Sequence, residues 1–390
     1  MIKFNFKKEY GAKPQNLHLR LIPDFTKDIK EIGEFNFTLL NADVSELDLS
    51  DMGDAVKVLN FDNNTVFPPT DKLPKWFDPK KILEDGKNPG LGIAALHKQG
   101  ITGLGITVAI IDEVLDTQHQ EIKDNLVHYE NIGWPENTPA QMHATAVSSL
   151  LCGKTVGVAP KTKLVFFAAN LKDGKPGEKT YVSNSNGKPI NIYLSNYAKA
   201  LKKILFMNAR LPKDERISAV SISSGMLWHD IECTNLIKQL IDSGVMVLTC
   251  DAENFYGEKA RFTRIHRLIN SDPDSPESYV YDRNRALVNS TDILVPSGGR
   301  TMAGFCGHDN YIYSGVGGLS WSTPYLVGVY ALAKQIMPNL TAQHFFDVVR
   351  QTGFSDTKFG NNIVIQPQKI IEYLQNEKIL QQQNIEAKSM

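Results

Sequence analysis

The chain has 390 residues and a formal net charge of −1, with 42% hydrophobic and 22% charged residues. This composition is typical of a globular protein with a full core, and the net charge excludes an overall basic field that would attract nucleic acid or anionic lipid. No run of about 18 apolar residues predicts a membrane-spanning helix, and the lysine-containing N-terminus lacks the apolar region of a secretory signal. We therefore expect a cytoplasmic protein without nucleic-acid or membrane partners.

The four cysteines are far apart in the sequence, and no two of them have C-x-x-C spacing. In a chain of this size without a secretory signal we expect Cys152, Cys233, Cys250 and Cys306 to be free thiols. No group of His, Cys and Asp residues has metal-ligand spacing, so the residues themselves predict no metal site and no cofactor.

The first 75 residues combine short alternating apolar runs with acidic segments, and they predict an N-terminal extension with a few strands. Residues 68–79 are rich in proline and aspartate, which is typical of a linker. We divide the remainder into a main domain, residues 76–366, and a polar helical tail, residues 367–390.

Strands and helices alternate in the main domain. The predicted strands span residues 106–112, 163–170, 217–225 and 245–250, and the predicted helices span residues 144–153, 191–207, 234–244 and 323–337. This alternation predicts an α/β fold with a doubly wound, mostly parallel sheet and helices on both faces. In such sheets the functional residues follow the carboxyl ends of the strands, and Asp112 has that position.

Three residues are candidates for catalysis. Asp112 ends a buried strand, where a structural carboxylate is the alternative interpretation. His143 precedes small residues that let an apolar helix approach the sheet. Ser320 follows a glycine-rich turn at the start of another apolar helix, whose free N–H groups suit a developing oxyanion. The alternative is that Ser320 or Ser322 is an ordinary helix cap.

The order Asp, His, Ser is that of subtilisin and differs from the orders in chymotrypsin and in α/β-hydrolases. From about residue 90 to 340, the chain resembles the subtilisin-like (subtilase) family of serine proteases. The matches are Asp112, Asp116 and His119 in the aspartate segment, His143 and the run Gly157–Pro160 in the histidine segment, and Gly318, Ser320 and Pro324 in the serine motif.

The resemblance implies a serine endopeptidase that acts on a peptide or protein substrate. Ser320 would be the nucleophile, His143 the general base and Asp112 the residue that orients it. The substrate would lie along Ser223, Ser224 and Gly225, which match the strand that forms one wall of the cleft. Family members often bind calcium, but the resemblance places no calcium site in this chain, and it implies a structural role for His119.

The family's oxyanion-hole asparagine falls at Glu253 in a gapless alignment and at Asn254 after a shift of one residue. A carboxylate would repel the oxyanion, whereas the backbone N–H of Ser320 is a donor in both cases. The chain also departs from the family motifs at Glu113, Ala144 and Trp321.

These departures favour a second hypothesis, a catalytically inactive subtilase-fold protein that binds a peptide or protein partner. A third hypothesis, a Rossmann-type nucleotide-binding protein, requires a glycine-rich loop after the first strand, which residues 110–116 lack. The N-terminal extension is either a removable propeptide or a permanent accessory domain, and its lack of a match to the usual propeptide favours the second.

Overall fold

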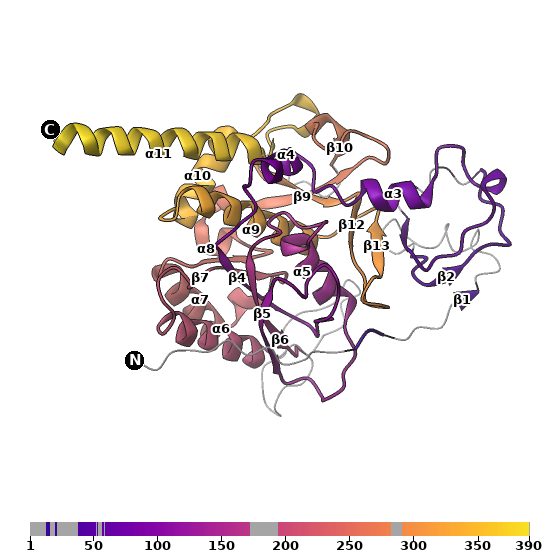
Figure 1. Ribbon diagram of the computed structural model, residues 1–390, viewed down its shortest axis with the longest axis horizontal. Helices are drawn as coiled ribbons and strands as arrows, with labels where there is room; N and C mark the ends of the chain where they lie inside the picture. Colours follow the sequence, from indigo (N-terminus) through magenta and orange to yellow (C-terminus); the bar gives the residue numbers. More distant parts are fainter. Residues whose placement is uncertain are drawn as a thin grey trace.

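The computed structural model describes residues 13–15, 20–21, 38–51, 53, 57, 59–171, 194–281 and 291–389. A central sheet with helices on both faces forms the body of the molecule, and smaller sheets and the N-terminal segment lie beside it (Figure 1).

The central sheet has five parallel strands. Their order across the sheet is β5 (Leu126–Ile132), β6 (Lys163–Ala169), β4 (Thr107–Asp112), β7 (Ile217–Ile222) and β8 (Met246–Thr249). All six residues of the central strand β4 are buried, as expected for a parallel strand covered on both faces. The predicted α/β class with a parallel sheet is confirmed.

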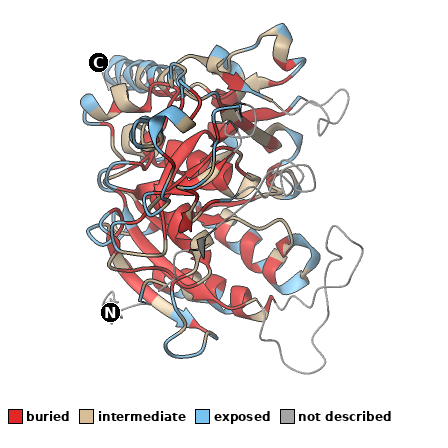
Figure 2. Ribbon diagram, turned by 90° about the vertical axis from the view of Figure 1, so that its right-hand side faces the viewer, coloured by how far each residue is buried: buried red, intermediate tan, exposed pale blue. Residues whose placement is uncertain are grey.

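Each face of the sheet has its own hydrophobic core. Helices α6 (Ser195–Asn208) and α7 (Ile231–Asp242) cover one face, and α5 (Met142–Cys152) and α9 (Leu319–Ile336) cover the other. Along β4, Ile110 belongs to one core and its neighbour Ile111 to the other, because successive side chains of a strand point to opposite faces. Figure 2 shows buried residues in red through the sheet and the helices packed on it.

The remaining elements surround this centre. The further strands are β1 (Arg20–Leu21), β2 (Ala42–Asp43), β3 (Asn60–Asp62), β9 (Phe262–Arg267), β10 (Tyr279–Val280), β11 (Ile293–Gly298), β12 (Arg300–Ala303), β13 (Tyr311–Ser314) and β14 (Ile363–Val364). The further helices are α3 (Pro79–Asp85), α4 (Ile93–Lys98), α8 (Glu253–Tyr256), α10 (Ala342–Thr352) and α11 (Pro367–Ser389). Short 3-10 helices are η1 (Thr70–Lys72), η2 (Leu227–His229), η3 (Glu258–Ala260), η4 (Pro276–Ser278) and η6 (Thr357–Phe359).

The N-terminal segment is built into the main domain. Strand β3 pairs antiparallel with β13, which itself pairs with β12. Phe61 of β3 packs against Phe77 and Tyr313, with ring centroids 5.9 Å and 5.4 Å away. The interpretation of residues 68–79 as a linker is wrong, because Leu73 and Phe77 are buried in this core.

The predicted tail is helical, as α11. Its first turns contribute Ile370, Ile371 and Leu374 to the main core, whereas its later residues are exposed. The helix extends away from the body of the molecule toward the C-terminus (Figure 1). In the described parts of the chain, no helix combines the length and the apolar character that crossing a membrane requires.

Two of the boundaries that differ from the prediction lie at the candidate site. Strand β7 ends at Ile222, so Ser223–Gly225 lie beyond the strand rather than within it. Helix α9 begins at Leu319, four residues earlier than predicted, and therefore contains Ser320. Strand β5 was not predicted, because its polar residues His128 and Glu130 interrupt the apolar run that marks the other strands.

Candidate active site

Asp112 and His143 meet at the carboxyl edge of the central sheet. Asp112 is the last residue of β4, and His143 lies in the first turn of α5. His143 Nδ1 donates to Asp112 Oδ1 at 2.8 Å, with Oδ2 at 3.0 Å. This bond holds the tautomer with a proton on Nδ1 and leaves Nε2 as the basic nitrogen.

The surroundings of His143 have opposing effects on its protonation. Burial disfavours the charged imidazole, whereas the charge of Asp112, its hydrogen bond and the charge of Glu113 favour it. The favourable interactions are stronger together, and they raise the pKa of His143 above its ordinary value. The ring also packs against Trp321, with centroids 5.3 Å apart, so an apolar surface covers one side of it.

Ser320 is the second residue of α9. Gly318, not a serine, is the N-cap, and Ser322 is buried with its hydroxyl bonded to Val295 O at 3.1 Å. The alternative that Ser320 or Ser322 caps the helix is therefore wrong. Ser320 Oγ donates to Ser223 O at 3.4 Å rather than to His143, and Ser223 Oγ donates to Ser320 O at 2.9 Å.

Ser320 and His143 line one cavity of about 420 Å³. Its other lining residues are Thr38, Leu40, Asn60, Met142, Arg264, Met302, Ile312, Ser314, Val316, Gly317, Gly318 and Trp321. Arg264 Nη1 donates to Gly317 O at 2.7 Å, next to the serine turn. The sequence carried no signal for Arg264 or for the N-terminal residues of this lining, because they come from segments far from the three motifs.

Among curated proteins, the subtilisin-like protease PopC of Myxococcus xanthus (strain DK1622) is 22% identical to this chain over 307 residues. The match covers 66% of this chain and 57% of PopC, so the chain spans little more than half the length of this relative. No protein-family model matches the chain.

Among solved structures, one described as the structural basis of subtilase cytotoxin SubAB assembly superimposes with a TM-score of 0.53 at 14% identity. It covers 74% of this chain and 96% of the matched chain. The chain is thus similar to a subtilisin-like protease, and its parallel sheet with flanking helices is a subtilase-like fold. The PatG macrocyclase in complex with peptide has a TM-score of 0.49 at 13% identity, over 73% of this chain and 95% of that chain.

The other predicted site residues lie outside the cavity of Ser320. Ser223, Ser224 and Gly225 follow β7 and are half-buried, and Ser223 is bonded to Ser320. Of the two oxyanion candidates, Asn254 is exposed and Glu253 is half-buried at the start of α8. Burial raises the pKa of Glu253. Neither lines the cavity, so both alternatives stay open.

His119 does not line the cavity of Ser320 and His143. Its ring is buried, Nε2 donates to Asn310 O at 2.8 Å, and Nδ1 accepts from Glu121 N at 3.2 Å. Both ring nitrogens are thus engaged in holding loops together. Within the described ranges, no group of three or more His, Cys, Asp and Glu side chains is arranged to hold a metal ion.

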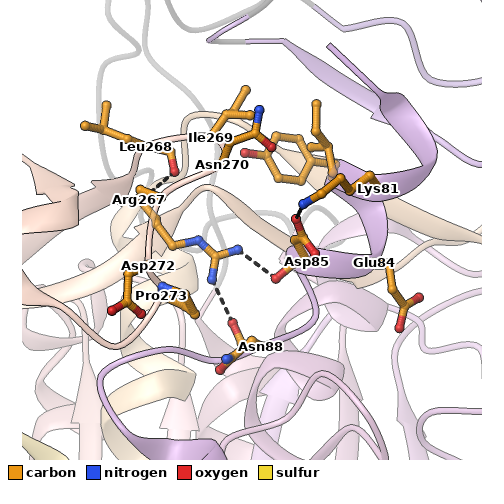
Figure 3. A pocket seen from close by; sticks show the side chains of 13 residues that line it. Lys81, Glu84, Asp85, Asn88, Arg267, Leu268, Ile269, Asn270, Asp272 and Pro273 are labelled. Carbon is orange, nitrogen blue, oxygen red and sulfur yellow. Dashed lines mark hydrogen bonds and ion pairs between the residues drawn. The ribbon is translucent and has the colours of Figure 1, made fainter. Parts of the chain in front are cut away.

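A second cavity, of about 470 Å³, lies on the other side of β13. Tyr313 lines this cavity, whereas its neighbours Ile312 and Ser314 line the one with Ser320. Arg267 donates to Asp85 O at 2.9 Å and to Asn88 O at 3.2 Å across it (Figure 3). These bonds join β9 to the end of α3, and none of the predicted site residues lines this cavity.

Proposed function

We propose that the chain is a serine endopeptidase that hydrolyses peptide bonds in a peptide or protein substrate through Ser320, His143 and Asp112. The observation that carries this proposal is the hydrogen bond between the buried Asp112 carboxylate and His143 Nδ1, next to the cavity that Ser320 shares. A carboxylate, an imidazole and a serine in this relation are the groups that nucleophilic acyl transfer requires.

The chemical steps follow from these roles. Ser320 Oγ attacks the carbonyl carbon of the scissile bond while His143 Nε2 accepts its proton, and the same imidazolium then protonates the leaving amine. Water next attacks the acyl-enzyme with His143 again as base. Asp112 stabilises the imidazolium in each half of the reaction.

The first step needs a side-chain rotation. The Ser320 hydroxyl donates to Ser223 O in this structure, and a change of its χ1 rotamer would turn it toward His143. The backbone N–H of Ser320, in the first turn of α9, is one donor for the oxyanion, and Glu253 or Asn254 is the candidate for the second.

A fluorophosphonate probe tests the proposal, because it phosphonylates only a serine that a neighbouring base activates. We expect the wild-type chain to be labelled at Ser320 and to hydrolyse an unstructured peptide, and Ser320→Ala to do neither. The control is the melting temperature of Ser320→Ala, which should match the wild type because the half-exposed hydroxyl leaves no core cavity. Labelling that persists in Ser320→Ala would refute the assignment.

The second candidate function is peptide binding without catalysis. Two features favour it: the Ser320 hydroxyl is bonded to Ser223, and one of the two candidate oxyanion residues is a glutamate, Glu253. In that case the wild-type chain would bind extended peptides with no labelling by the probe and no hydrolysis.

A further inference from the structure

Two chain segments run side by side where the central strands β7 and β8 end. The strands pair in parallel up to Ile222 and Thr249, and beyond them Cys250 N donates to Ser224 O at 3.1 Å. Residues 223–225 and 250–252 therefore stay next to each other past the edge of the sheet, which is the edge where Asp112 also ends its strand.

The carboxylate of Asp251 lies directly against Gly225. A Cβ atom built on Gly225 would be 2.6 Å from Asp251 Oδ2 and 2.9 Å from Oδ1, closer than a side chain tolerates. Glycine at position 225 is thus what leaves room for this carboxylate. Trp228 Nε1 donates to Asp251 Oδ2 at 3.2 Å and holds it in place.

Both segments also contact the start of α9, where Ser320 lies. Ser223 is bonded to Ser320 in both directions, and two residues of extended chain from Ser223 to Gly225 span at most about 7 Å. From the other segment, Cys250 Sγ is 3.5 Å from Thr323 Oγ1, one helical turn after Ser320. The neighbours of Gly225 and Asp251 along the chain thus contact the turn of α9 that carries Ser320.

Asp251 is half-buried, and burial raises its pKa. Within the described residues no lysine or arginine is bonded to it. Its hydrogen-bond donor is the neutral Trp228 indole, and His229, whose ring lies against Trp228, acts on it electrostatically and lowers its pKa. A partly desolvated carboxylate without a lysine or arginine bonded to it favours a ligand that brings a permanent cation.

We propose that Asp251 selects a basic side chain, arginine or lysine, at the substrate residue that carries the scissile carbonyl. This inference rests on the proposed function. A peptide pairs with residues 223–225 and presents the scissile carbonyl to Ser320. The side chain of the residue that carries this carbonyl then extends along Gly225 toward Asp251. The guanidinium or ammonium group then bonds to the Asp251 carboxylate.

The test uses four peptides that differ only in the residue before the scissile bond, which is Arg, Lys, Leu or Glu. We expect kcat/KM of the wild type to be highest for Arg and Lys. Asp251→Asn keeps the shape and the acceptor for Trp228 but removes the charge, and it should lower kcat/KM for Arg by roughly 10- to 100-fold. For Leu, the change should be at most about threefold.

Asp124→Asn is the matched control, because Asp124 is exposed at the opposite edge of the sheet, before β5, and loses the same charge. Asp251→Lys should invert the preference toward Glu. If Asp251→Asn does not fold, Asp251→Glu retains the charge and should retain the preference for Arg. Equal kcat/KM for Arg and Leu in the wild type, or an unchanged preference in Asp251→Asn, overturns the inference.

Failure of the proposed function has a different signature. A chain that is neither labelled by fluorophosphonate nor hydrolyses any of the four peptides is not the proposed endopeptidase. The selectivity is then measured as binding of the same peptides by fluorescence anisotropy. Tighter binding of the Arg peptide that Asp251→Asn abolishes supports the inference, and equal binding of all four peptides overturns it.

Discussion

At the scale of single residues, the site combines groups that favour positive charge on His143 with an apolar surface that opposes it. Asp112 and Glu113 both favour the imidazolium, whereas burial beside Trp321 disfavours it. In the proposed acyl transfer the imidazolium forms in every step, so carboxylates that favour it would stabilise the transition states as well as the resting charge. They also set the pH at which the base becomes available.

The raised pKa of His143 predicts the acid limb of the pH profile. Only neutral His143 acts as a base, so kcat/KM should rise with pH through a midpoint above about 6.5. Glu113→Gln removes one of the charges that raise this pKa, and the midpoint should move to lower pH with little loss at the plateau. Asp112→Asn, in contrast, should lower the plateau by about 10⁴ through loss of the tautomer. A midpoint that Glu113→Gln leaves in place would contradict this account.

The oxyanion position gives a second prediction at this scale. If Asn254 supplies a side-chain donor, Asn254→Ala should lower kcat by roughly 10²–10³ with little change in KM, because the bond strengthens only in the tetrahedral state. If Glu253 faces the site, Asn254→Ala should have almost no effect and Glu253→Asn should raise kcat. Both variants are measured on one peptide. No effect of either variant would mean that backbone N–H groups hold the oxyanion.

At the scale of elements, the N-terminal segment and the main domain share structure near the site. Strand β3 completes the sheet of β12 and β13, and Thr38, Leu40 and Asn60 line the cavity of Ser320. The N-terminal segment therefore forms part of the wall of this cavity. Its removal would expose the aromatic core that contains Tyr313.

We predict that Phe61→Ala lowers the free energy of unfolding by about 3–5 kcal/mol, because Phe61 is fully buried among Phe67, Phe77 and Tyr313. Urea denaturation followed by fluorescence measures the effect. Phe206→Ala is the matched control, since Phe206 is 50% exposed on α6, and it should change the free energy by about 0.5 kcal/mol or less. A loss for Phe61→Ala as small as that for Phe206→Ala would show that packing of Phe61 in the N-terminal core does not contribute to stability.

At the scale of the whole molecule, stability comes from two cores on the faces of one sheet and a third around β3. All four cysteines carry free thiols. Burial raises the pKa of Cys152 to about 12, so this thiol does not ionise at neutral pH. Disulfide bonds therefore do not contribute to the stability of this fold.

It follows that dithiothreitol should leave the melting temperature unchanged within error. Differential scanning fluorimetry with and without the reductant measures this, and the same chain refolded in oxidised glutathione serves as the control. A drop of many degrees on reduction would reveal a disulfide and refute the free-thiol assignment.

The sequence by itself determined the α/β class, the four apolar strands of the central sheet and the resemblance to the subtilisin-like family. These features depend on local patterns, because a buried parallel strand is a continuous apolar run and a catalytic motif is a short segment. The pairing of Asp112 with His143 was likewise predictable, since each residue lies in a motif at the edge of the sheet.

Only the tertiary structure decided which distant segments contact these motifs and strands. Asp62 pairs with Ile312, and Asp251 lies against Gly225. These contacts join segments far apart in the sequence, so no local pattern of apolar residues predicts them. The edge strand β5 was not predicted, because polar residues interrupt its apolar run. The partner of the Ser320 hydroxyl depends on a side-chain rotamer and on the backbone of Ser223, and both are set by packing between distant segments.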